Sequence, residues 1–168
     1  MAKKSTYTVP GLSEEAGQKA VEILQGRLNE YNDLQLTLKH VHWNVVGPNF
    51  ISVHEMIDPQ VDLVRLYADA AAERIAALGG SPRGTVGGIA EDRALPEYPL
   101  GRNTALEHLK ALDGIYDVVI TDNREAITAL EELDVVTQDM VIGQTAELEK
   151  FQWFVRAHLE NAGGQLPQ

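Results

Sequence analysis

The chain has 168 residues, the size of one ordinary domain, and its 44% hydrophobic and 23% charged residues are typical of a globular protein. With 25 acidic and 14 basic residues the formal net charge is −11, which repels phosphate backbones and attracts cations. No stretch approaches the ~20 apolar residues of a membrane span or resembles a signal peptide, so we expect a cytoplasmic protein with no membrane partner. The absence of cysteine excludes disulfides and thiolate chemistry, which leaves imidazole and carboxylate as the strong metal ligands.

The first predicted element is a long amphipathic helix that follows a short arm. Residues 1–12 form the N-terminal arm, and Ser13 is placed to cap the helix, with acidic residues in its first turn. Gly47-Pro48 ends the helix. Its predicted buried seam follows steps of three, four and seven and comprises Leu24, Leu28, Tyr31, Leu38 and His42.

A second helix is predicted from Phe50 to Leu78. Pro59 lies inside this pattern and removes one backbone hydrogen bond, so we expect a kink or a loosened turn beside Asp58. The predicted apolar stripe of this helix comprises Ile57, Val61, Val64, Ala68, Ala71, Ile75 and Leu78.

Glycines and prolines interrupt the periodicity over residues 81–102, which predicts a crossover loop of about twenty residues. A loop of this length suits a link between helices that are parallel rather than antiparallel neighbours. A third helix is predicted over residues 103–132, with Asn103 as its N-cap, and a fourth over residues 135–161.

These elements predict an all-α fold in one domain. The helices form a four-helix bundle over residues 13–162 with one long crossover connection, followed by a short C-terminal tail at residues 163–168. Sustained alternation of apolar and polar residues is absent, so no strand is expected.

Two pairs of metal-type side chains lie on the second helix, each pair spaced i,i+4. His54 and Asp58 share one helix face near its start, and Asp69 and Glu73 share a face further along. Asp58 and Asp69 are eleven positions apart, which is roughly 16 Å along a helix axis and too far for both to bind one metal ion. Each pair is therefore half a site. Two antiparallel copies of the chain, related by a two-fold axis, would complete two equivalent sites at their interface.

Further candidates lie at the end of the first helix. His42 continues the apolar seam. Considered alone, it is more simply interpreted as a core histidine that is hydrogen-bonded to a neighbour. His40 lies on another face and is expected at the surface. Trp43 is expected in the core, although beside His42 it could also donate an electron to trap a radical. For the charges of the second helix, a solvated face is an equally good interpretation. Imidazole with carboxylate suits iron, zinc or manganese, of which iron is the most readily redox-active.

Several short motifs of this chain occur together in one family. They are His42-Trp43-Asn44, Gly47, Asn49-Phe50, Val53-His54-Glu55-Met56, Asp58, Asp69, Ala72-Glu73-Arg74, Lys150-Phe151 and Trp153-Phe154. With these residues the chain resembles the Dps family of miniferritins (DNA protection during starvation), over nearly all of its helical length. The resemblance implies an intersubunit ferroxidase centre that takes His42, His54 and Asp58 from one subunit and Asp69 and Glu73 from its two-fold mate.

The resemblance also implies a function. It predicts a homo-oligomer, a hollow dodecamer, that oxidises ferrous iron, typically with hydrogen peroxide, and stores the ferric product as a mineral. Removing both Fenton reagents would protect DNA chemically. Glu55 is a weaker candidate for mineral nucleation. The acidic residues of the turn between the last two helices either line a three-fold entry pore or form a solvated turn; they are Glu131, Glu132, Asp134 and Asp139.

Physical DNA binding is expected to be weak or absent. The tail 163–168 has no basic residue, so binding would rest on Lys3 and Lys4, multiplied by the number of arms. Two other functions remain open. A metal-dependent hydrolase would use the same interfacial ions to lower the pKa of a bound water. A DNA-compacting protein without important iron chemistry is disfavoured by the net charge of −11.

Overall fold

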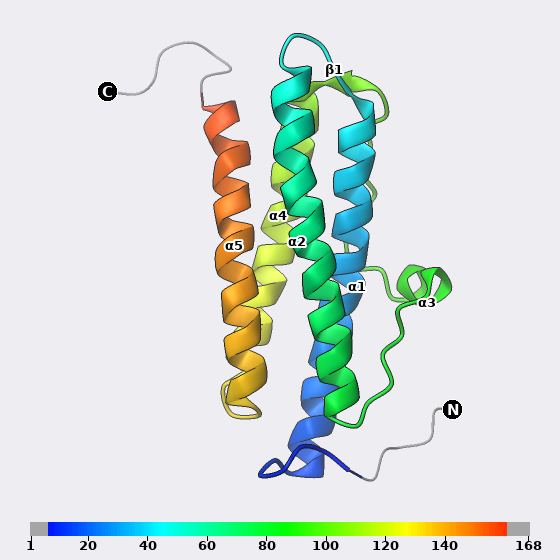
Figure 1. Cartoon of the computed structure of the whole chain (residues 1–168), viewed down its shortest axis with the longest axis vertical. Helices are drawn as coiled ribbons and strands as arrows, with labels where there is room; N and C mark the ends of the chain where they lie inside the picture. Colours follow the sequence, from blue (N-terminus) through cyan, green and yellow to red (C-terminus); the bar gives the residue numbers. More distant parts are fainter. Residues whose placement is uncertain (1–6, 161–168) are drawn as a thin grey trace.

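The fold is a bundle of four long helices joined by one long crossover, as predicted (Figure 1). The computed structural model describes residues 7–160. The helices are α1 (Glu14–Asn44), α2 (Phe50–Ala77), α4 (Ala105–Leu130) and α5 (Val135–Leu159). α1 packs mainly against α2, and α4 mainly against α5. Within residues 7–160, no helix is both long enough and apolar enough to cross a lipid bilayer.

The crossover differs in two details from the predicted structureless loop. It contains a short helix, α3 (Val86–Glu91). In addition, β1 (Val45–Val46), directly after α1, pairs in parallel with β2 (Asn103–Thr104), directly before α4. The expectation that no strand would form was therefore wrong. Two-residue strands are too short to show any alternation, and only the return of the chain beside the end of α1 creates them.

The starts of the four long helices agree with the sequence at three positions, including Phe50 for α2. Ser13 caps α1, and its Oγ accepts a hydrogen bond from the Ala16 amide at 3.2 Å. The predicted cap of the third helix was wrong, because Thr104 holds that position. The side chain of Asn103 instead accepts a hydrogen bond from the amide of Thr104, at 2.8 Å. α5 begins at Val135, as predicted, and Asp134 caps it.

The predicted apolar seams form the core. Leu24, Tyr31 and Leu38 of α1 are fully buried, and so are most of the predicted stripe residues of α2. α2 continues through Pro59 without interruption, so a loosened turn there does not end the helix. The predicted end of the last helix at Asn161 and the tail 163–168 lie outside the described residues.

A buried polar network crosses the bundle between α1, α4 and α5. The Arg27 guanidinium binds the Glu30 carboxylate through two contacts of 2.6 and 2.9 Å and also donates to Asn123 Oδ1 at 3.1 Å. The Tyr31 hydroxyl lies 3.0 Å from Gln144 Oε1. All five residues are buried, so this network sets the register of three helices against one another.

Candidate metal centre

Two histidines stack where the end of α1 meets the start of α2. The ring centroids of His42 and His54 are 3.6 Å apart, and the ring planes differ by 22°. Each Nδ1 lies beside the backbone carbonyl of the other residue, at 3.1 Å for His42 Nδ1 and 2.9 Å for His54 Nδ1. An Nδ1–H that donates to a carbonyl leaves the Nε2 lone pair for a metal, and it fixes the orientation of the ring.

Asp58 joins this pair one turn further along α2. Its Oδ1 lies 3.2 Å from His42 Nδ1 and 2.9 Å from Lys39 Nζ. The hydrogen bond from Lys39 lowers the pKa of Asp58, so the group is a carboxylate at neutral pH. The structure therefore brings together His42, His54 and Asp58, the three residues that the resemblance assigns to one subunit.

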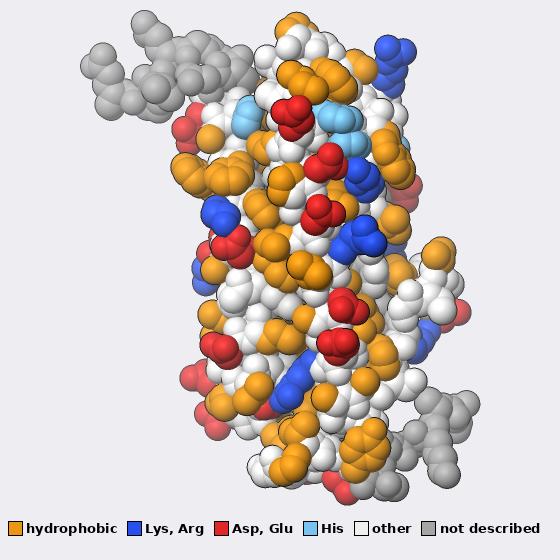
Figure 2. Space-filling model, viewed as in Figure 1, with side chains coloured by type: hydrophobic (Ala, Val, Ile, Leu, Met, Phe, Trp, Pro, Cys, Tyr) orange, Lys and Arg blue, Asp and Glu red, His pale blue; other side chains and the backbone are white. Residues whose placement is uncertain are grey.

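Asp69 and Glu73 lie elsewhere on α2. Both side chains are exposed. Figure 2 shows acidic groups in a line along this face of the molecule, with histidines near its upper end. Over residues 7–160 no three His, Asp or Glu side chains converge closely enough to hold a metal ion by themselves. One subunit therefore presents two separate parts of the predicted site, as the spacing of Asp58 and Asp69 requires.

Two neighbours of the histidine pair differ from expectation. Trp43 is not a core residue: it is 70% exposed. The reason is that it follows His42 by one position, so it points about 100° away from the seam that His42 continues. His40 is half-buried rather than at the surface, because its Nε2 lies 2.6 Å from the carbonyl oxygen of Leu100 in the crossover.

Large apolar side chains are exposed on the same two helices. Leu36 and Trp43 on α1 and Ile51 and Leu66 on α2 each expose more than half of their surface. Leu66 lies three residues from Asp69, on the same side of α2. Exposed apolar groups gathered beside charged ones are typical of a protein interface.

The acidic residues around the turn between α4 and α5 differ in their exposure to solvent. Asp134 is buried, and its Oδ2 accepts a hydrogen bond from Arg74 Nη2 at 2.6 Å and another from Thr137. It therefore cannot line a pore, contrary to one of the two interpretations of this turn. Glu131, Glu132 and Asp139 are exposed.

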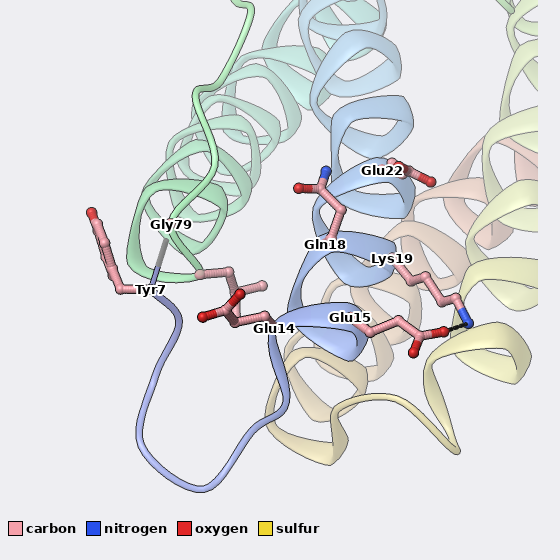
Figure 3. Close-up of a pocket in the computed structure, with 8 residues that line it drawn as sticks. Tyr7, Glu14, Glu15, Gln18, Lys19, Glu22 and Gly79 are labelled. Atoms are coloured by element: carbon pink, nitrogen blue, oxygen red, sulfur yellow. Dashed lines mark hydrogen bonds and ion pairs between the residues drawn. The ribbon is translucent and has the colours of Figure 1, made fainter. Parts of the chain in front are cut away.

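Three cavities lie away from the histidine pair. One, of about 490 Å³, lies between the start of α1 and the end of α2, where Figure 3 shows Glu14, Gln18 and Glu22 beside the Glu15–Lys19 ion pair. The other two lie at the α4–α5 turn and between α1 and α4. None of the three is lined by a candidate ligand. The hydrolase alternative requires a substrate pocket beside the metal, and these cavities do not supply it.

Known proteins resemble this chain along most of its length. The ferritin-like domain family matches residues 21–163. The DNA protection during starvation protein of Mycolicibacterium smegmatis is 61% identical over 162 residues, which cover 96% of this chain and 88% of that protein. The fine tangled pili major subunit of Haemophilus ducreyi is 50% identical over 166 residues, with coverage of 99% and 88%.

Solved structures agree with this relationship. The structure of Mycobacterium smegmatis Dps matches with a TM-score of 0.92 at 61% identity and covers 98% of this chain and 93% of that one. DpsA14 from Streptomyces coelicolor matches with a TM-score of 0.92 at 55% identity, with coverage of 98% for both chains. The shared helices include both parts of the candidate metal centre. This chain belongs to the Dps family of ferritin-like proteins.

Proposed function

We propose that the protein oxidises ferrous iron at centres shared between two subunits and stores the ferric product inside a hollow dodecamer. The observation that carries this proposal is the stacked pair His42 and His54 with Asp58 beside it. A second acidic pair, Asp69 and Glu73, is exposed further along the same helix. Two imidazoles with three carboxylates form a donor set suited to ferrous iron, and the carboxylates favour the higher charge of the ferric product.

The residues of this chain have separable roles in such a centre. The hydrogen bonds of both Nδ1 atoms to backbone carbonyls hold the rings and leave His42 Nε2 and His54 Nε2 as the nitrogens that would bind iron. Asp58, and Asp69 and Glu73 of a second subunit, would offset the charge of the bound ions. Two ferrous ions then give one electron each to one hydrogen peroxide, which takes up two protons and becomes two waters.

A two-fold interface is the arrangement that completes the site. Leu36, Trp43, Ile51 and Leu66 would lose their exposure to water at such an interface, which stabilises association. Each partner typically contributes about 800 Å² to a stable interface, so the metal ligands are a small part of it. The oligomer is therefore expected to assemble without bound metal.

Protection of DNA follows from the chemistry and does not require contact with DNA. Consuming ferrous iron together with peroxide removes the two reagents that generate hydroxyl radicals. The net charge of −11 fits this mode of protection, because it repels the phosphate backbone. Relatives of this chain carry the name DNA protection during starvation protein.

The test is anaerobic loading of the assembled protein with ferrous iron, followed by peroxide and a count of the iron retained per assembly. We expect fast oxidation with retained ferric iron, and a loss of at least about tenfold in initial rate for His54→Ala. Glu97→Ala, which removes an exposed carboxylate in the crossover, is the matched control and should behave as wild type. Oxidation no faster than in buffer would refute the proposal. Amide or ester hydrolysis with zinc would instead support the hydrolase.

A further inference from the structure

The last residues of the N-terminal arm fold back onto the bundle. The chain reverses in a tight turn, in which the Leu12 amide donates a hydrogen bond to the Val9 carbonyl at 3.3 Å and Gly11 has the positive φ of +85° that such a turn requires. Figure 3 shows the chain returning from the start of α1 to Tyr7, which lines the same cavity as Gly79, just past the end of α2. The arm therefore lies against the helices rather than pointing away from them.

Gly17 of α1 makes room for the arm. It is buried, and a Cβ atom at this position would lie 2.6 Å from Thr8 Oγ1 and 3.2 Å from Thr8 Cβ. The first of these distances is too short for a non-bonded contact. Apart from proline, glycine is the least favourable residue inside a helix, so the helix itself gains nothing from it. The side chain of Thr8 fills the notch that Gly17 leaves on α1.

Two opposing contributions act on the arm at this contact. The Thr8 hydroxyl is buried, and no hydrogen bond joins it to another residue of the range 7–160. A buried hydroxyl without a partner has lost its hydrogen bonds to water and regains them when the arm leaves. Val9 and Leu12 pack against the core, which favours the bound arm. The hydroxyl therefore favours release, and the apolar contacts favour docking.

We propose that Thr8 and the notch at Gly17 form a releasable seat for the arm, and that the seated arm withholds Lys3 and Lys4 from DNA. Release of residues 7–12 lengthens the reach of the arm by roughly 20 Å, at about 3.3 Å per extended residue. This length exceeds the Debye length of about 8 Å at physiological ionic strength. The two lysines of a released arm therefore meet phosphates beyond most of the repulsion from the acidic protein surface.

Carboxylates oppose DNA binding by a seated arm. The length of the chain keeps Lys3 and Lys4 within roughly 15 Å of Tyr7. The cavity that Tyr7 lines is also lined by three glutamates of α1, namely Glu14, Glu15 and Glu22. Their charges repel phosphates and attract the ammonium groups of the lysines, so a seated arm competes poorly for DNA. The seat is remote from the proposed metal centre, and ferrous oxidation should not change when the arm is released.

The experiment measures hydrogen exchange of the arm amides, and gel-shift retention of a double-stranded DNA fragment by the assembled protein at low salt. Gly17→Ala fills the notch. Gly26→Ala is the matched control, because Gly26 lies on the same helix and a Cβ atom there meets nothing within 4 Å. Both variants gain helix propensity. In Gly17→Ala alone we expect arm exchange about tenfold faster and DNA binding about tenfold tighter, with a thermal midpoint no lower than that of wild type.

Thr8→Val shifts the balance in the opposite direction. Valine has nearly the shape of threonine and lacks the hydroxyl, so the arm amides should exchange about tenfold more slowly than in wild type. Replacing Lys3 and Lys4 by alanine in the Gly17→Ala background should remove the gain in DNA binding.

Three results would overturn the proposal. Arm exchange in Gly17→Ala at the rate of Gly26→Ala would show that the notch does not hold the arm. Wild-type exchange in Thr8→Val would show the same, and this variant decides the matter if Gly17→Ala does not assemble. Faster exchange in Gly17→Ala with DNA binding no tighter than in Gly26→Ala would show that the seat does not control access to DNA.

Discussion

Arg74, in the last turns of α2, donates a hydrogen bond of 2.6 Å to Asp134, the residue that caps α5. This contact joins the helix that carries Asp69 and Glu73 to the opposite half of the bundle. Burial acts to raise the pKa of Asp134, but the hydrogen bonds from Thr137 and Arg74 outweigh it and lower the pKa below its usual value.

Asp134→Ala should therefore destabilise the protein by about 2 to 4 kcal/mol, because it removes a helix cap and leaves the largely buried Arg74 without its partner. Thermal unfolding of the metal-free protein checks this. Since the folded pKa is lowered, the contribution of Asp134 is present at neutral pH and is lost as the pH falls through that pKa. Asp139→Ala, an exposed neighbour on α5, is the control; an equal loss there would show that the acidic turn matters only through its charge.

The raised pKa of Glu30 predicts that the stability of the fold depends on pH with the opposite sign. Burial raises its pKa to about 7, the attraction of Arg27 opposes this, and repulsion from Asp122 adds to it. The folded protein then holds a proton that the unfolded chain releases near the ordinary glutamate pKa of 4.5. This contribution to stability declines as the pH rises from about 4.5 to 7.

Glu30→Gln should accordingly make the thermal midpoint less dependent on pH across this window, since an amide cannot ionise. Unfolding midpoints measured from pH 5 to 8 give the comparison. The control is Glu125→Gln, because Glu125 is an exposed carboxylate that lines the cavity between α1 and α4 together with Glu30. An unaltered pH profile in Glu30→Gln would show that Glu30 is ionised throughout and that Arg27 dominates its environment.

The proposed shared centre predicts complementation between two inactive variants. His54→Ala and Asp69→Ala should each lose most ferrous oxidation, because each damages one part of every site. Reassembling an equal mixture produces mixed dimers in which one site carries both lesions and the other carries none. Part of the activity should return, measured as the initial rate after peroxide addition. Mixed dimers, verified by mass, that stay inactive would contradict shared sites.

DNA binding, if it occurs, should depend on the arm. Replacing Lys3 and Lys4 by alanine should abolish any retention of DNA in a gel shift at low salt, because they are the only basic residues in the terminal segments 1–12 and 163–168 of the sequence. Retention by the wild type should already be poor near physiological salt, where the Debye length is about 8 Å. Tight binding by the double variant would point to a basic surface on the assembled cage.

The sequence alone was sufficient for the features that depend on local spacing. Steps of three and four placed the buried seams of the first two long helices, because residues at this spacing share one helix face. The eleven positions between Asp58 and Asp69 likewise separated the two parts of the proposed metal centre, since the rise per residue of a helix is constant. Ser13 as a cap follows from the same kind of local rule.

Only the tertiary structure decided how groups on different helices meet. The Lys39 contact with Asp58, the burial of Asp134 against Arg74, the exposure of Trp43 and the pairing of β1 with β2 all depend on where the reversals and the crossover bring separate segments. Periodicity reports which face of one helix is apolar, but it carries no information about the partner that faces a given polar residue. These contacts cost desolvation and chain entropy that are recovered only when the whole bundle has formed, so no single segment encodes them.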